Sequence, residues 1–482
     1  MSSVRCSVTD GVRTTSIYVI VAIHAMVTSR WICQTEVKNP VLNHKIFSIF
    51  KDVIQFGLPL LFFCSGRSAE FLNKKYGDSV DIPLLRYLIK FCGFIFKKLT
   101  RLIIPGIFAY FLIVIPDAYI SQSYRIGISD FKGRSNNFFT FFTNVVSSFQ
   151  DGLSWLWFLP TLFLISVINY PLTSGRMGLL FIWGLIFWGL FLWLLLLGRR
   201  PDDWYSYIEP LVAVLPYFSM AFFGANEIRF PISFVTVIFS SLMLAIIPFT
   251  KNETVPMLTL NVIFYNFYYI AGALSTRVKF DFLTVVKKMS TISRVLAYCL
   301  FTLFFVITAP HDELSEGELW YRFPVYNRPA QCFAMVFGSW LWLVLLWIFG
   351  RLVFEPQTPE LFSSGSTVHA QSMIMYLTHW LCIDIAVRLI IFPVSSYNFT
   401  NEKRQVLTGT DLNFWFVWSL LSISGWTISW LFYISLQWVS SSTGISFSAI
   451  GINAFKDVNK KLSNKSLLSK PEESISETGS NV

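Results

Sequence analysis

The amino-acid sequence predicts an all-α, polytopic transmembrane helical bundle of about 10–12 spans. Two observations carry this prediction. First, 54% of the 482 residues are hydrophobic and only 14% are charged, whereas soluble domains carry about 25% charged residues. So few charges cannot cover a soluble protein of this length, which excludes a soluble enzyme, a disordered chain and a disulfide scaffold. Second, the apolar residues gather in runs long enough to cross a bilayer.

Twelve stretches meet the length of about 20 mostly apolar residues that a spanning helix needs. They run over 14–33, 46–66, 101–120, 155–173, 178–197, 208–225, 231–249, 256–275, 292–309, 330–350, 369–394 and 413–437. The second holds Lys51 and Asp52 and the sixth holds two prolines, so a count of ten or eleven stays open. We therefore expect one transmembrane domain over 1–440 and a polar, disordered, cytoplasmic tail over 441–482.

Loop charge predicts the orientation of these spans. Basic residues gather in the stretch 67–101, in the loop 277–288 and in the tail, and basic loops of membrane proteins lie on the cytoplasmic side. Twelve spans with a cytoplasmic N-terminus place all three there, so both termini are expected to be cytoplasmic. The net charge of +10 thus indicates loop orientation rather than nucleic-acid binding. We expect a multi-pass integral protein of the plasma membrane or an endomembrane.

The segment 82–100 departs from simple spanning. It alternates apolar and basic residues at helical spacing, which favours an interfacial helix on the cytoplasmic leaflet that continues into the third span.

His24 is the most informative ionisable residue inside a predicted span. It lies mid-way along the first span and follows Arg13 by eleven residues, so the two share nearly the same helix face. A neutral imidazole is a good general base near neutral pH. A histidine hydrogen-bonded to a neighbouring helix for packing explains the residue equally well, and both interpretations stay open on these residues alone.

The opening segment TDGVRTTSIYVIVAIHAM resembles the first-span signature of the acyltransferase-3 family of membrane acyltransferases. That signature is Asp-Gly-Leu-Arg, ten mostly apolar residues and then His. Asp10, Gly11, Arg13 and His24 match it, and Val12 stands where Leu is usual.

Four further stretches resemble family motifs in the expected order, and the resemblance covers roughly residues 8–440 on the same span interpretation. They are FGLPLLFFCSGRSAEF at 56–71, FKKLTRLIIPGIFAYF at 96–111, SWLWFLPTLFLIS at 154–166 and QSMIMYLTHWLCI at 371–383. The block at 56–71 leans toward the branch similar to glucan biosynthesis protein C, whose members modify polysaccharides.

The resemblance implies transfer of an acyl group, by default acetyl, from cytoplasmic acyl-CoA to a hydroxyl of a carbohydrate or lipid-linked acceptor. His24 would be the catalytic residue, as general base or as a transient acyl carrier. Arg13 would orient the site or bind the donor's phosphates. Lys98 and Arg101 would hold the CoA phosphates, with Lys98 standing where the family has Arg.

The same resemblance implies that Tyr376 and His379 line the acceptor side. The expected partners are acyl-CoA, the acceptor and the lipid bilayer, with no bound cofactor, no metal and no nucleic acid. A multi-span transporter or flippase of a lipid or small molecule is the alternative, although we find no internal repeat of the kind such proteins show. A membrane scaffold without chemistry explains the hydrophobicity but not the ordered motifs.

Overall fold

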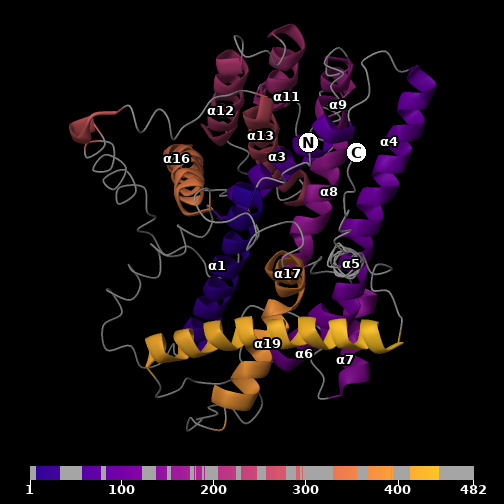
Figure 1. The fold of residues 1–482 in the computed structure, drawn as a ribbon, viewed down its shortest axis with the longest axis vertical. Coiled ribbons are helices and arrows are strands. Elements are labelled where there is room, and N and C mark those ends of the chain that lie inside the picture. Colours follow the sequence, from indigo (N-terminus) through magenta and orange to yellow (C-terminus); the bar gives the residue numbers. More distant parts are fainter. Residues whose placement is uncertain are drawn as a thin grey trace, which may run out of the picture.

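The computed structural model describes residues 7–32, 57–76, 83–121, 137–148, 154–173, 179, 181–186, 189, 205–223, 230–246, 257–277, 289–293, 296, 329–354, 367–391, 393 and 413–443. All regular secondary structure in these residues is helical, as the composition predicts (Figure 1). Much of the predicted spans 178–197 and 292–309 lies outside the described residues. So do Lys51, Asp52, the predicted loop 278–288 and the tail after Thr443.

The described helices follow one another along the whole chain. The α-helices are α1 (Ser7–Ile32), α3 (Gly57–Tyr76), α4 (Leu84–Lys98), α5 (Ile104–Ala109), α6 (Ile115–Ser121), α7 (Phe138–Ser148), α8 (Phe158–Ile168), α9 (Tyr170–Thr173), α11 (Tyr205–Phe223), α12 (Phe230–Ile246), α13 (Met257–Arg277), α16 (Pro329–Phe354), α17 (Thr367–Ala386) and α19 (Phe414–Thr443). The labelled elements also include three π-helical segments and one 3₁₀ turn: η1 (Leu99–Ile103), η2 (Tyr110–Val114), η5 (Val387–Ile391) and η4 (Ser154–Trp157).

Four of the described helices are long and apolar enough to cross a membrane. These stretches are Val8–Ser29, Leu84–Ile120, Ser372–Ile391 and Phe414–Val439. Length and composition of this kind are what a bilayer requires of a spanning helix, so the structure is consistent with an all-α membrane protein.

Proline shapes the helix that runs without interruption from Leu84 to Ser121. Pro105 and Pro116 have no N–H to donate, and each ring displaces the carbonyl four residues earlier. Just before each proline the backbone hydrogen bonds span five residues instead of four. The N–H of Ile104 donates to the Leu99 carbonyl oxygen, and the N–H of Ile115 donates to the Tyr110 carbonyl oxygen. The π segments η1 and η2 therefore follow directly from the sequence. Segment η5 likewise ends two residues before a proline.

Two glycines allow α3 and α13 to pack backbone against backbone. A Cβ atom at Gly66 would lie 2.0 Å from the carbonyl oxygen of Tyr269, and one at Gly272 would lie 2.0 Å from that of Phe63. Only glycine fits at both positions, and small residues serve the same purpose at other membrane-helix crossings. This crossing fixes the two helices relative to each other.

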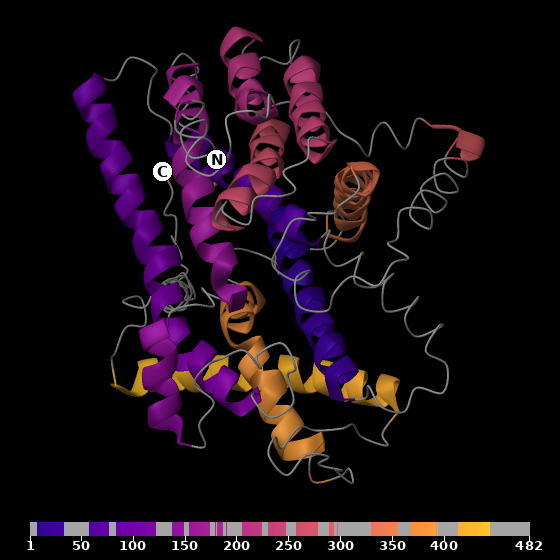
Figure 2. The ribbon, with the colours of Figure 1, turned by 180° about the vertical axis from the view of Figure 1, so that it is seen from behind.

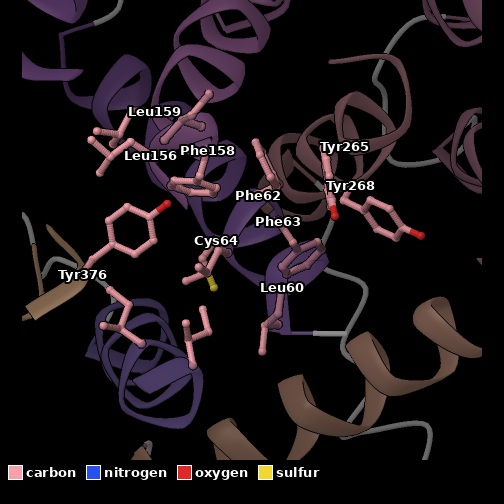
Figure 3. Close-up of a cluster of buried hydrophobic side chains, with 14 of the residues drawn as sticks. Leu60, Phe62, Phe63, Cys64, Leu156, Phe158, Leu159, Tyr265, Tyr268 and Tyr376 are labelled. Carbon is pink, nitrogen blue, oxygen red and sulfur yellow. The ribbon is translucent and has the colours of Figure 1, made fainter. Parts of the chain in front are cut away.

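An aromatic chain joins four helices in the core next to this crossing (Figure 3). The Phe62 ring of α3 lies 4.5 Å from that of Tyr265 on α13 and 4.8 Å from that of Phe158 on α8, centroid to centroid. Phe158 in turn contacts Tyr376 of α17 at 5.5 Å. Aromatic pairs at such separations add to the free energy of burial, so α17 is tied to the α3–α13 pair through α8.

Helix α19 crosses α1 at a steep angle and contacts α17 as well (Figures 1 and 2). The indole N–H of Trp418 donates to the Ala22 carbonyl oxygen at 2.7 Å, and that of Trp426 donates to the Tyr18 oxygen at 3.2 Å. Gly425 lies between them, where a Cβ would approach Val21 to 3.1 Å. Helix α19 thus holds α1 within the two turns that precede His24.

Candidate active site

His24 lies in the C-terminal half of α1, half-buried between helices that close around it. Its neighbours Ala25 and Met26 are buried, and α1 packs against α3, α16, α17 and α19. Asp10 in the first turn favours helix formation, since a negative charge there complements the helix dipole. The surrounding helices hold the His24 backbone in place on several sides.

His379 meets His24 from α17. Its Nε2 atom lies 2.6 Å from Nδ1 of His24, although the two residues are 355 positions apart in the chain. The other ring nitrogen, Nδ1, lies 2.7 Å from the carbonyl oxygen of Tyr376 and 3.1 Å from that of Met375. The His379 side chain is fully buried. We call the two histidines the histidine pair.

The two rings of the histidine pair lie edge to edge, in line. Their planes are 10° from parallel and their centroids are 4.8 Å apart. Rings stacked face to face could not bring two ring nitrogens to within 2.6 Å of each other. The distance between the two nitrogens, added to the distance from each nitrogen to the centre of its own ring, nearly equals the distance between the centroids, so the two nitrogens lie on the line that joins the ring centres. The hydrogen bond between them is therefore close to linear, the geometry in which such bonds are strongest.

Trp380 covers the ring of His24. The two rings have centroids 4.5 Å apart and planes 26° from parallel, so the indole face supports the imidazole plane. An aromatic face also attracts a cation, which suits a ring that takes up a proton during a reaction. The sequence did not single out Trp380, because one of 17 tryptophans carries no distinguishing signal beyond its position after His379.

The other predicted acceptor-side residue, Tyr376, is buried one turn before His379. Its ring centroid lies 6.0 Å from that of His379, and Figure 3 shows its side chain directed toward Phe158. The structure thus brings together three of the six residues singled out from the sequence: His24, His379 and Tyr376.

Arg13 does not reach the histidine pair. Eleven residues of α-helix at 1.5 Å each place it roughly 16 Å from His24 along α1. There it forms an ion pair with Asp10, with 3.4 Å between Nη2 and Oδ1. Its guanidinium therefore acts at a different depth from the His24 ring.

Lys98 and Arg101 lie on the helix that α4 and η1 form, and η1 packs against α8. Figures 1 and 2 show α4 at the edge of the molecule. The Lys98 ammonium lies over the Phe94 ring at 5.5 Å, and Arg101 is exposed. The structure does not bring these two cations to the histidine pair.

A second buried polar group lies apart from the histidine pair. The Asn169 amide donates to the Asn266 carbonyl oxygen at 2.6 Å, the Asn266 amide donates to the Tyr217 hydroxyl at 2.8 Å, and that hydroxyl donates to the Asn169 oxygen at 3.2 Å. We call this closed arrangement the asparagine ring. Every member both donates and accepts, which suits a structural role.

In the described part of the chain, no three His, Cys, Asp or Glu side chains lie close enough together to bind a metal ion. The chain matches no protein-family model, no curated protein and no solved structure in the three comparisons made. The resemblance to the acyltransferase-3 family rests on the motif residues alone.

Proposed function

We propose that this protein is an integral membrane O-acyltransferase that moves an acyl group, by default acetyl, from cytoplasmic acyl-CoA to a hydroxyl of a carbohydrate or lipid-linked acceptor. One observation carries the proposal. Two histidines from two separate motifs, 355 positions apart in the chain, form a direct hydrogen bond of 2.6 Å. A packing histidine needs only one partner of any kind, whereas a second, backbone-anchored imidazole is the arrangement that activates a general base.

Arg13 extends the proposal toward the donor. With a cytoplasmic N-terminus, the start of α1 faces the compartment that holds acyl-CoA, and His24 lies roughly 16 Å deeper along the same helix. CoA carries its phosphates at one end of a long, flexible arm and its thioester at the other. Arg13 would bind the phosphates while the thioester reaches His24. Lys98 and Arg101 would attract the donor from the cytoplasmic side at longer range.

The proposal includes the wider arrangement of the chain. It has ten to twelve spans, both termini in the cytoplasm, and a place in the plasma membrane or an endomembrane, as loop charge favours. The acceptor would approach from the far side or within the bilayer, and Tyr376 would help to bind it.

Mass spectrometry of surface glycans and lipids tests this function in cells. A strain without the protein is compared with strains that re-express the wild type, His24→Ala or His369→Ala. His369→Ala is the matched control, since it removes a histidine from α17 that is not part of the pair. We expect the acyl mass to be missing in the deletion and His24→Ala strains and restored by the other two. An acyl pattern restored by His24→Ala at normal abundance would rule out His24 as the catalytic residue.

Binding of labelled acyl-CoA to the purified protein separates this function from transport. We expect saturable binding that falls when Arg13 is replaced by Gln. A transporter or flippase of an unrelated lipid or small molecule would bind no acyl-CoA above background, and that result would contradict the proposed function.

A further inference from the structure

The hydrogen bonds of His379 determine which of its nitrogens carries the proton. Nδ1 faces two carbonyl oxygens of its own helix, those of Met375 and Tyr376, at 3.1 and 2.7 Å. A carbonyl oxygen only accepts, so Nδ1 must be the N–H. Both carbonyls belong to the preceding turn of α17, so this tautomer is set by local helical geometry before α17 meets α1.

The tautomer of His24 follows from that of His379. His379 is fully buried, and burying a charge is costly, so its ring is taken as neutral, with a lone pair on Nε2. A separation of 2.6 Å from Nδ1 of His24 requires one proton between the two nitrogens. That proton must sit on Nδ1 of His24, since Nε2 of His379 has none. A neutral His24 ring then carries its lone pair on Nε2. These positions are assigned from the hydrogen-bond pattern.

We propose that His379 is a positioning residue that holds His24 as the Nδ1–H tautomer, which makes Nε2 of His24 the atom that accepts the acceptor hydroxyl's proton. The inference rests on the proposed function and names the atom that acts in it. Trp380 completes the arrangement, because its ring lies against that of His24 at 4.5 Å and limits the tilt of the imidazole plane.

The chemical step balances without any further reactant. The acceptor oxygen attacks the carbonyl carbon of the acyl thioester, a C–O bond forms, and the C–S bond breaks. The hydroxyl proton passes to Nε2 of His24 and from there to the departing thiolate, which leaves as free CoA. Throughout, the Nδ1–H of His24 donates to His379, so the imidazolium that forms in between is oriented and stabilised.

Two replacements of His379 separate positioning from packing. Gln carries an acceptor oxygen at about the reach of Nε2, so His379→Gln keeps a partner for the Nδ1–H of His24, whereas His379→Leu fills the space and accepts nothing. We expect acyl transfer by His379→Gln to stay within about tenfold of wild type and that by His379→Leu to fall by about 10²–10⁴-fold. Equal loss in two folded variants, or wild-type activity in His379→Leu, would overturn the proposal.

Nitrogen-15 NMR of histidine-labelled full-length protein gives a readout that does not depend on activity. At a pH where both rings are neutral, we expect the His24 signal, assigned by its loss in His24→Gln, to show a proton on Nδ1 in the wild type and in His379→Gln. A wild-type His24 protonated on Nε2 would overturn the inference even if His379→Leu failed to fold. Acyl transfer by His24→Ala is measured separately. A wrong tautomer assignment would therefore appear in the NMR spectrum, whereas a wrong proposed function would appear as acyl transfer that does not depend on His24.

Discussion

At the scale of single residues, the hydroxyl of Tyr217 closes the asparagine ring. It accepts from Asn266 and donates to Asn169, and all three side chains are buried. A buried polar group that loses its partner leaves the other groups unsatisfied. The stability of this region therefore depends on the completeness of the ring rather than on any one of its hydrogen bonds.

Tyr217→Phe removes that hydroxyl and little else. We expect it to lower the free energy of unfolding by about 1 kcal/mol, the upper part of the range found for hydrogen bonds between membrane helices. Unfolding in detergent micelles measures the change. The same replacement in an Asn266→Leu background should cost much less, because the ring is then already open. Equal costs in both backgrounds would show that the three side chains do not act together.

The sequence predicts which residues belong to the candidate site where a motif contains them, but it does not predict which of those residues contact one another. His24 was singled out because an ionisable residue is rare in an apolar helix, and His379 because it stands in a stretch that resembles a motif of the acyltransferase-3 family. Their contact was not predicted, because nothing in one sequence relates positions 355 apart. Arg13 was expected either to orient the site or to bind the donor's phosphates. Since helical rise separates it from His24 by roughly 16 Å, binding of the donor phosphates is the role proposed for it.

At the scale of helices, the crossing of α3 and α13 depends on two glycines. A Cβ atom would come within 2.0 Å of a backbone oxygen at Gly66 and at Gly272, a distance that no side-chain rotation relieves. At Gly93 in α4, by contrast, nothing lies within 4 Å of an added Cβ. Replacing glycine by alanine at a crowded position and at the open position therefore gives a matched comparison.

We expect Gly272→Ala to destabilise the protein by about 1–3 kcal/mol, the cost typical of an overpacked core. Gly93→Ala should be neutral or stabilising, because alanine is the better helix former. Thermal unfolding of the two variants in the same detergent measures both effects. A Gly272→Ala protein as stable as Gly93→Ala would show that α3 and α13 are not in backbone contact.

The second predicted span ends just before a charged residue, where the observed helix does not end. Hydropathy ends the second span at residue 66, yet α3 continues to Tyr76. The reason is that Arg67 finds partners inside the protein: it donates to the Ser275 hydroxyl at 3.0 Å and lies over the Trp347 ring at 4.7 Å. A hydropathy rule counts the charge but not its partners. By contrast, the expectation that the segment 82–100 is helical and continues into the third span is confirmed, since α4 and η1 form one continuous helix with it.

At the scale of the whole molecule, composition alone predicts the fold class. Charges are too scarce for a soluble surface of this size, and every described regular element is a helix. The arrangement of those helices depends on contacts that composition does not encode, such as the indole donors of α19 against the backbone of α1.

The proposed topology predicts that both ends of the chain lie in the cytoplasm. Epitope tags added at residue 1 and after residue 482 should bind antibody only after the membrane is permeabilised, because basic loops on the same side hold the spans in that orientation. A tag placed in the acidic stretch 312–318 is the control and should be accessible in intact cells or sealed vesicles of outward orientation. A terminal tag that is accessible without permeabilisation would contradict this topology.

The most direct test of acyl transfer at the histidine pair follows label from acetyl-CoA into membrane acceptors. Isolated membranes that hold equal amounts of wild-type, His24→Ala or His369→Ala protein are incubated with acetyl-labelled acetyl-CoA, and label in the lipid and glycan fractions is counted. The account predicts label with the wild type and His369→Ala, and a loss of at least about 10²-fold with His24→Ala. Equal labelling by wild type and His24→Ala would contradict it.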